Sequence, residues 1–158
     1  MSVELELRVV SPGNDEYVDV AWRLKERIRR RDGVLKQRKG FFTDAYRRAQ
    51  VHAYFIDDRL VGFASTRRDG YLLFLAVAHD FRGEGLGKRL IAQVADEHHA
   101  VTCHARTTNA DALAFYDHLG FEIERRITGY YEDGGDAYYL KLGETRSLVD
   151  RLSEFVRG

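Results

Sequence analysis

The residues best suited to chemistry in this chain form the glycine-rich run Arg82-Gly83-Glu84-Gly85-Leu86-Gly87-Lys88. Glycine lets the backbone adopt a positive φ and come close to a ligand. The amphipathic pattern from Leu86 to Ala95 predicts a helix that begins inside this run. The first N–H groups of a helix attract anions, and Arg82 and Lys88 add positive charge. The run therefore predicts a pyrophosphate site, although a glycine turn without a ligand would have the same sequence.

The residues before the glycine-rich run, from Tyr71 to Ala78, are almost all apolar and predict a strand. Two known phosphate-binding patterns do not fit the resulting strand, turn and helix. A Walker pattern has Ser or Thr after its lysine to bind magnesium, whereas Arg89 follows Lys88 here. The dinucleotide fingerprint has a different glycine spacing and an acidic residue about twenty residues later. Neither pattern identifies the ligand.

A second segment with a distinctive pattern, NADALAFYDHLGF, runs from Asn109 to Phe121. Asn109 is a favourable N-cap residue, and Gly120 is typical of the position just after a helix. Apolar residues between them recur at helical spacing. The segment therefore predicts a helix that ends at Gly120, followed by a strand that begins at Phe121.

Together, the two segments resemble the cofactor motifs of the GNAT superfamily of acetyltransferases. The glycine-rich run has the pattern R-x-x-G-x-G, and the second segment has N-x-x-A-x-x-F-Y-x-x-x-G-F at every specified position. The resemblance extends over about residues 50 to 142, and the first fifty residues match in general layout. It implies an acetyl-CoA-dependent N-acetyltransferase, with acetyl-CoA as cosubstrate and no metal.

The resemblance also implies a fold. We expect one α/β domain over residues 1–158, with a mixed, mostly antiparallel sheet, a splayed central parallel strand pair and helices on both faces. In this superfamily the strand before the glycine loop carries a bulge. The sequence patterns predict strands at 4–10, 51–56, 60–66, 71–78, 101–106, 121–125 and 137–142, and helices at 15–31, within 32–50, at 86–95 and at 109–119. Residues 143–158 predict a C-terminal helical extension.

The resemblance assigns roles to residues along the cofactor. Leu75, Ala76 and Val77 are expected to line the pantetheine arm, where a backbone amide polarises the thioester carbonyl. Asn109 is expected to contact the same arm. Tyr116 matches the tyrosine that protonates, or hydrogen-bonds, the leaving sulfur. Its place on an apolar helix stripe also fits an ordinary core residue.

Further resemblances concern the acceptor. His104 begins the string HARTTN, similar to the H-x-x-x-S-N of one N-terminal acetyltransferase group, where the histidine holds a water that takes the amine proton. Tyr71 stands eleven residues before Arg82, as a tyrosine does in that group. Tyr130 and Tyr131 resemble a tyrosine pair that closes over the peptide backbone. The alternative for His104 is a strand histidine with only structural contacts. The alternative for Tyr130 and Tyr131 is a pair of ordinary hairpin surface residues.

One departure concerns the loop between the first two helices. N-terminal acetyltransferases usually have an aromatic-proline pattern there, and this chain has no proline in that loop. Phe41 and Phe42 are the candidates for a pocket wall, but the family's peptide specificity does not carry over. The remaining histidines have no zinc-binding spacing, so no metal site is expected.

The acceptor class follows from amine pKa values. An α-amine with a pKa of about 7.8 is about one-seventh neutral at pH 7, whereas only about one lysine in 2,500 is neutral. A histidine base suits the easier acceptor, so a protein or peptide N-terminal α-amine is the leading substrate. A small-molecule amine is the alternative within enzymes, and a non-catalytic acyl-CoA-binding sensor domain is the alternative outside them.

The charge distribution suggests a second interaction surface. The chain has 25 basic and 25 acidic residues, so as a whole it lacks the positive charge typical of nucleic-acid-binding proteins. Residues 23–48 are basic, with eleven Lys or Arg and three acidic residues. This segment is either the exposed face of an amphipathic helix or a docking face for an acidic partner, such as ribosomal RNA on the ribosome or the CoA phosphates.

Composition sets the remaining expectations. Cys103 is the only cysteine, so no intramolecular disulfide can form. No signal peptide or membrane-spanning apolar run is apparent. We therefore expect a cytoplasmic protein without a membrane partner, as a monomer or a homodimer.

Overall fold

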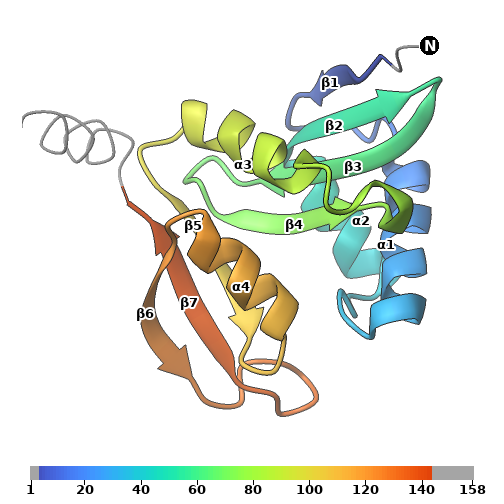
Figure 1. Cartoon of the computed structure of the whole chain (residues 1–158). Helices are drawn as coiled ribbons and strands as arrows, with labels where there is room; N and C mark the ends of the chain where they lie inside the picture. Colours follow the sequence, from blue (N-terminus) through green and yellow to red (C-terminus); the bar gives the residue numbers. More distant parts are fainter. Residues whose placement is uncertain (1–3, 144–158) are drawn as a thin grey trace, which may run out of the picture. The chain divides into compact units, whose positions relative to one another are not determined.

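The computed structural model describes residues 4–143 of the 158-residue chain (Figure 1). These residues divide into two compact units at the junction between Val94 and Ala95. The first unit contains β1 (Glu6–Val10), α1 (Val18–Asp32), α2 (Lys39–Arg48), β2 (Gln50–Ile56), β3 (Arg59–Thr66), β4 (Leu72–Val77), η1 (His79–Phe81) and most of α3 (Leu86–Asp96). The second unit contains β5 (Val101–Arg106), α4 (Ala110–His118), β6 (Glu122–Ile127) and β7 (Ala137–Leu142). The predicted α/β class is confirmed.

The sheet of the first unit is antiparallel, with the strand order β1-β2-β3-β4. Strands β2 and β3, which correspond to the predicted strands 51–56 and 60–66, form a hairpin in which Ile56 pairs with Arg59. Between them, Asp57 and Asp58 have φ values of 48° and 62°. A tight two-residue hairpin turn favours positive φ at both central positions, and aspartate adopts this conformation more readily than most residues. The sequence pair Asp-Asp therefore suits the turn, and a shift in the pairing between Tyr54 and Phe55 sets the register further along the hairpin.

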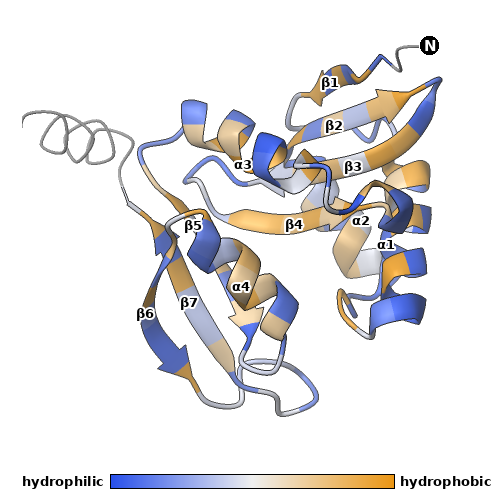
Figure 2. Cartoon of the chain, in the orientation of Figure 1, coloured by the Kyte–Doolittle hydropathy of each residue, from blue (hydrophilic) through white to orange (hydrophobic). Residues whose placement is uncertain are grey.

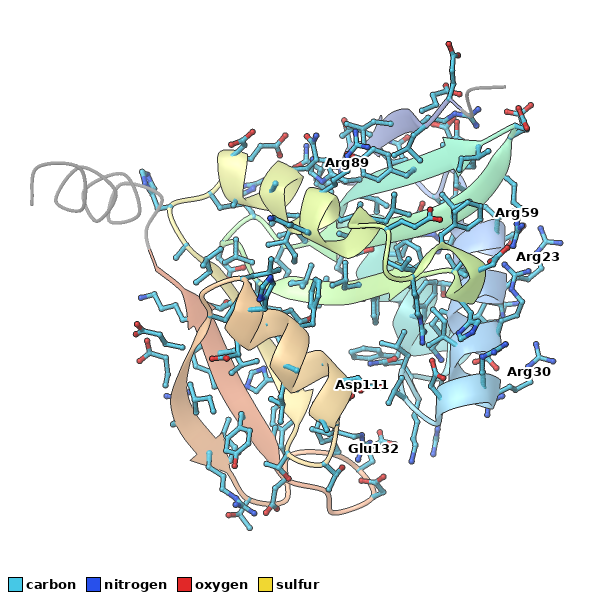
Figure 3. The ribbon with its side chains drawn as sticks, viewed as in Figure 1. Arg23, Arg30, Arg59, Arg89, Asp111 and Glu132 are labelled. Carbon is cyan, nitrogen blue, oxygen red and sulfur yellow. The ribbon has the colours of Figure 1, made fainter. Side chains whose placement is uncertain are left out.

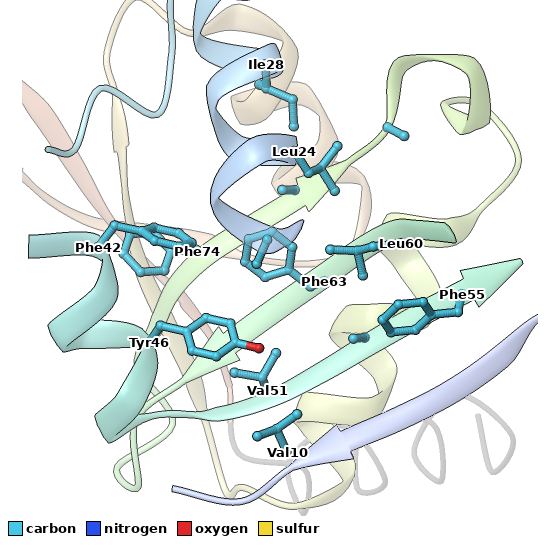
Figure 4. Packing of buried hydrophobic residues seen from close by; sticks show 14 residues of the cluster. Val10, Leu24, Ile28, Phe42, Tyr46, Val51, Phe55, Leu60, Phe63 and Phe74 are labelled. Atoms are coloured by element: carbon cyan, nitrogen blue, oxygen red, sulfur yellow. The ribbon is translucent and has the colours of Figure 1, made fainter. Parts of the chain in front are cut away.

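The core of the first unit lies between this sheet and helices α1 and α2 (Figure 4). Phe42 of α2 is completely buried, and its ring centroid lies 6.2 Å from that of Phe63 and 4.7 Å from that of Phe74. Leu24 and Ile28 of α1 join the same cluster because residues four apart share one helix face. Truncation of a buried aromatic ring typically costs about 3–5 kcal/mol. This packing holds β4, the strand that leads to the glycine-rich run.

Helix α3 packs against the same sheet from the other side. Along β3, Phe63 faces the cluster with α1 and α2, so its neighbour Gly62 faces the opposite side. A Cβ atom on Gly62 would lie 3.2 Å from Leu86 Cδ2 and 3.4 Å from Leu90 Cδ1, both on α3. The sheet of the first unit therefore has helices on both faces, as predicted.

The second unit has a three-stranded antiparallel sheet with the order β5-β7-β6. Strands β5 and β7 have the predicted bounds and pair continuously from Val101–Leu142 to Arg106–Ala137. Helix α4 ends before Gly120, whose φ of 98° suits a glycine after a helix. Figure 2 shows that β6 is largely hydrophilic, in agreement with its mostly exposed side chains.

Some expectations differ from the structure or remain predictions. Helix α1 begins at Val18 instead of Asp15, because Tyr17 has a left-handed φ of 65° that interrupts the helix. The splayed parallel pair and the single domain would each involve both units, and they stay predictions. Beyond Gly143, the expected C-terminal helix lies outside the described residues. Within residues 4–143, no helix combines the length and apolar character that a membrane span needs.

Candidate active site

The glycine-rich run forms a backbone turn that leads directly into α3. Gly83 and Gly85 both have a φ of 80°, in the region that side chains other than glycine rarely adopt. A Cβ atom at either position would have no neighbour within 4 Å, so the outer side of the turn is open. The helix begins at Leu86, and the first intrahelical bond runs from Arg89 N–H to Gly85 C=O. The turn therefore presents backbone amides, which suit the negative oxygens of a pyrophosphate.

The charged residues of the run are exposed, and one of them is held in place. Arg82 Nη2 lies 2.7 Å from Asp32 Oδ2 at the end of α1, and Arg82 Nε donates to the Val77 carbonyl. Glu84 and Lys88 are exposed. The sequence analysis identifies Arg82 as a cationic donor, but nothing in the sequence indicates that Asp32 is its partner. A guanidinium has five N–H donors, so an ion pair at one edge leaves donors for an anion at another.

Strand β4 presents two different faces. Phe74 and Ala76 are buried, whereas Leu75 and Val77 are partly exposed, as expected for residues that alternate along a strand. Ser65 pairs with Phe74 and Thr66 with Leu72, so Leu73 is the extra residue of a bulge. The bulge implied by the family resemblance is therefore confirmed. The partly exposed residues of β4 are those available to a cofactor arm.

Tyr71 lies at the start of this strand, next to the β3–β4 turn. The guanidinium of Arg67 lies 4.5 Å from the centre of the Tyr71 ring. Asp69 accepts a hydrogen bond from the Tyr71 backbone amide and pairs with Arg67. These contacts fix the ring at the end of the strand. The role of the phenol in the reaction stays a prediction.

The adjacent pair Phe41 and Phe42 divides between surface and core. Phe41 is 61% exposed, whereas Phe42 has no exposed surface. A side chain that is completely buried in the core cannot contact a substrate in this structure. The prediction that Phe42 walls a substrate pocket is therefore wrong for this residue, because its ring packs on Phe63 and Phe74. The role of Phe41 as a pocket wall stays a prediction.

In the second unit, α4 carries two of the expected residues. Asn109 is the N-cap, and its Oδ1 accepts a hydrogen bond from the Ala112 amide at 3.1 Å. Tyr116 is buried, and its ring packs edge-on against Phe115 and Phe121. A hydrogen bond joins the Tyr116 side chain to Cys103 of β5. The phenol therefore already interacts with a sulfur atom and also contributes to the core.

Cys103 itself is unsuited to nucleophilic chemistry. Burial raises the pKa of its thiol to about 12, and the hydrogen bond from Tyr116 only partly opposes this shift. The thiolate is the nucleophilic form, and at pH 7 it is essentially absent at such a pKa. The only cysteine of the chain is thus a core residue, and it does not offer a route through an acyl-cysteine.

An aromatic cluster forms around His104 of β5. Its ring stacks on Tyr130, with centroids 4.2 Å apart and planes within 10°, and it also contacts Tyr139 of β7 at 5.0 Å. Tyr131 meets Tyr130 edge-on at 5.0 Å. The structure thus brings together three residues that the sequence suggested separately. Tyr130 remains 43% exposed, so the cluster reaches the surface.

Arg106 supports this cluster and is absent from the sequence prediction. Its guanidinium lies 4.0 Å from the centre of the Tyr131 ring and pairs with Asp133 at 3.0 Å. Burial raises the pKa of Tyr131 to about 12, while the positive charge of Arg106 opposes this rise. The phenol therefore stays protonated at neutral pH. The spacing of two residues between His104 and Arg106, on one strand face, was the signal that could have identified Arg106.

The predicted site residues are divided between the two units. The first unit holds the open glycine turn, β4, Tyr71 and Phe41. The second holds Asn109, Tyr116 and the aromatic cluster of His104, Tyr130 and Tyr131. Among residues 4–143, no group of three His, Cys, Asp or Glu side chains is placed to hold a metal ion.

Comparisons with known proteins show similarity to acetyltransferases. Residues 36–129 match the family described as acetyltransferase (GNAT) domain. The chain is 38% identical over 80 residues to N-alpha-acetyltransferase 30 of Xenopus laevis, an alignment that covers 48% of this chain and 29% of that protein. It is 37% identical over 93 residues to N-alpha-acetyltransferase MAK3 of Arabidopsis thaliana, covering 56% and 49%. The alignments thus span less than half the length of these relatives.

A solved structure extends the likeness over most of the chain. The ribosomal-protein-S18-alanine N-acetyltransferase of Escherichia coli superimposes with a TM-score of 0.68 at 24% identity, covering 87% of this chain and 93% of that one. At this identity the superposition shows a shared fold. The family match spans more than half of the 158 residues and includes the glycine turn and α4. The chain therefore belongs to the GNAT acetyltransferase family.

Proposed function

We propose that this protein is an acetyl-CoA-dependent N-acetyltransferase that acts on the α-amine of a protein or peptide N-terminus. The observation that carries the proposal is the glycine turn, in which Gly83 and Gly85 take positive φ directly before α3 in a chain of this family. The choice of acceptor is supported by the His104 cluster and by relatives named N-alpha-acetyltransferases.

The first unit would bind the cosubstrate. Backbone amides of the glycine turn and the first turn of α3 would hold the pyrophosphate, aided by Arg82 and Lys88. Leu75 and Val77, on the partly exposed face of β4, would contact the pantetheine arm together with Ala76 backbone atoms. From the second unit, Asn109 would also contact the arm, through its amide nitrogen, because its Oδ1 already caps α4. Acetyl-CoA, when bound, supplies the acetyl group as a thioester.

The second unit would supply the proton transfers. His104 would accept the proton of the attacking amine through a water molecule, and Tyr130 would hold the imidazole by stacking. The amine nitrogen forms a bond to the carbonyl carbon as the carbon–sulfur bond breaks. The Tyr116 hydroxyl would hydrogen-bond the departing sulfur and protonate it. The buried neutral thiol of Cys103 favours this direct transfer over a covalent acyl-enzyme.

Aromatic side chains of each unit are the candidates for contacts with the acceptor. We assign Tyr130, Tyr131 and the exposed Phe41 to contacts with the peptide, and Tyr71 to the orientation of the amine. The raised pKa of Tyr131 keeps its hydroxyl a hydrogen-bond donor over the working range of the reaction.

The experiment is acetyl transfer to a mixed panel, followed by mass spectrometry of the products. The panel contains peptides with varied first residues, peptides with a blocked N-terminus and an internal lysine, polyamines and aminoglycosides. We expect acetylation of free peptide α-amines and none of the blocked peptides. Transfer only to small amines would replace the proposed acceptor class. Binding of CoA without any transfer would favour a sensor domain.

Tyr116→Phe separates catalytic from structural roles of the phenol. The substitution keeps the ring that packs on Phe121 and removes the hydroxyl. We expect kcat to fall about tenfold to a hundredfold, with a similar melting temperature, because acid catalysis typically contributes about a hundredfold or more. Unchanged turnover would show that the tyrosine serves only the core.

A further inference from the structure

A pocket of about 520 Å³ lies in the first unit, between α1 and the beginning of α2. We call it the α1–α2 pocket. The side chains that matter for its chemistry are Trp22, Glu26, Arg29, Lys36, Arg38 and Lys39. The size is within the range of about 300–1,000 Å³ that is usual for small-ligand sites. It has room for one or two amino-acid side chains.

The charge of the α1–α2 pocket is strongly positive. Four of its residues are Lys or Arg, and Glu26 is the one acidic residue that lines it. The Glu26 carboxylate is already shared between Arg29 Nη2 at 2.7 Å and Lys25 Nζ at 3.0 Å. These hydrogen bonds lower the pKa of Glu26 to about 2, so it remains ionised and pairs internally. The pocket as a whole therefore favours an anionic ligand.

The wall of the pocket is firmly built. Lys25 has no exposed surface, and its ammonium group lies 4.6 Å from the centre of the Trp22 ring. The same ammonium donates to the Gln37 carbonyl, which ties the loop after α1 to the helix. Gly33 ends α1 in a left-handed conformation and turns the chain back. The Trp22 ring and the hydrogen-bonded loop after α1 therefore hold the Lys and Arg residues of the pocket in defined positions.

Two contacts connect this pocket to the elements that would bind acetyl-CoA. Asp32, which directly precedes Gly33, pairs with Arg82 of the glycine turn. Trp22 contacts Phe42, with centroids 5.5 Å apart, and Phe42 contacts Phe74 of β4 at 4.7 Å. All of these residues belong to the first unit. The pocket is therefore connected to the glycine turn through the ion pair of Asp32, and to β4 through the buried ring of Phe42.

We infer that the α1–α2 pocket binds acidic side chains of the acceptor peptide, so that N-termini followed by Asp or Glu are the preferred substrates. This inference rests on the proposed function, because it supposes a peptide acceptor. Carboxylates form strong charge-assisted hydrogen bonds with Lys and Arg, and their carbon stems pack on an aromatic ring. An acidic acceptor also accounts for those basic residues of the segment 23–48 that line the pocket.

A peptide fits these observations better than a nucleic acid. The pocket is local, and the chain as a whole has no net charge, whereas nucleic-acid-binding domains are usually basic overall. Competition by RNA at the pocket is therefore an outcome of the test that would overturn the inference.

The test compares two peptides with the same first residue and a free α-amine, one followed by two glutamates and the other by two glutamines. For the unaltered protein we expect kcat/KM to be about tenfold or more higher for the glutamate peptide, mainly through KM. In the double variant Lys36→Gln/Lys39→Gln this preference should largely disappear. The matched control is Arg23→Gln/Arg27→Gln, which removes two charges from the exposed face of α1. Figure 3 shows Arg23 directed outward. The control should keep the preference.

Binding gives a readout that does not depend on turnover. Trp22 is the only tryptophan of the chain and lines the pocket, so its fluorescence should change when the glutamate peptide is added. The glutamine peptide and short RNA should give much smaller changes at the same concentration. If both peptides are acetylated equally and neither changes the fluorescence, the inference is overturned while the proposed function stands. If no peptide α-amine is acetylated, the proposed function itself fails.

Discussion

The glycine turn and the His104 cluster are built in opposite ways. The turn has exposed residues, positive φ at Gly83 and Gly85, and open space where side chains would be. The cluster depends on side chains, with His104 stacked on Tyr130 and Tyr131 held by Arg106. The turn depends on glycines that permit positive φ, so a change of residue there acts through the backbone. The cluster depends on the rings themselves, so a change of residue there removes a contact directly.

The largest effect is expected in the cluster. His104→Ala removes the proposed base together with its stacking contact on Tyr130. We expect kcat for peptide acetylation to fall about a hundredfold or more, with little change in KM for acetyl-CoA. Steady-state kinetics measure both. The matched control is His118→Ala at the exposed end of α4, which should keep full activity. Equal activity of the two variants would remove His104 from the reaction.

A smaller effect, of a different kind, is expected in the turn. Gly85→Ala meets no neighbouring atom, but an alanine at φ 80° is strained by about 1–2 kcal/mol. The turn should shift, so we expect KM for acetyl-CoA to rise about tenfold while kcat changes little. Gly40→Ala is the control, because its Cβ is also unobstructed and Gly40 lies in the first turn of α2, where alanine is tolerated. A normal KM in Gly85→Ala would show that the turn does not need this conformation.

A third variant tests whether Arg106 positions Tyr131. A Cβ atom on Gly135 would lie 2.6 Å from Arg106 Nη1, so Gly135→Ala should push the flexible guanidinium away from the Tyr131 ring. We expect KM for the peptide to rise about threefold, with kcat and the melting temperature nearly unchanged. Gly143→Ala, which has open space around it, serves as the control. A large drop in melting temperature would instead assign Arg106 a mainly structural role.

The smallest effect is expected for Cys103. Its thiol has a pKa of about 12 and stays protonated, so it carries no reactive thiolate between pH 6 and 9. We expect Cys103→Ala to lose about 1 kcal/mol of unfolding free energy and to keep its pH–activity profile over this range. Chemical denaturation and turnover assays measure these quantities. An acetylated Cys103 in the intact mass of the unaltered protein would contradict direct transfer.

Sequence patterns predicted regular elements best where one face is buried. Strands β5 and β7 have the predicted bounds, and buried apolar residues alternate along β5. Asn109 caps α4 as expected. Local backbone conformation was harder to foresee. Tyr17 has positive φ without being glycine, so the start of α1 carried no recognisable signal.

Long-range contacts explain most of what the sequence did not reveal about the site. Asp32 pairs with Arg82 across 50 residues, and Arg106 meets Asp133 across 27, so neither pair has a local pattern. Phe41 and Phe42 are adjacent in α2, and the rotation of about 100° between successive helix residues places one ring at the surface and the other in the core. The candidate site residues lie in recognisable sequence motifs, whereas their supporting partners do not.

Gly62 has a consequence for any attempt to redesign the enzyme. A single hydrogen in place of a side chain lets α3 rest on β3, because a Cβ would meet Leu86, Leu90 and the Ala76 carbonyl at 3.2–3.4 Å. The glycine turn is continuous with the first turn of α3. The absence of a Cβ atom at Gly62 therefore also determines how closely the turn lies to the sheet. If the glycine turn were replaced by a loop that accepts a bulkier acyl donor, the new loop would keep its own backbone geometry only if Gly62 of β3 were retained.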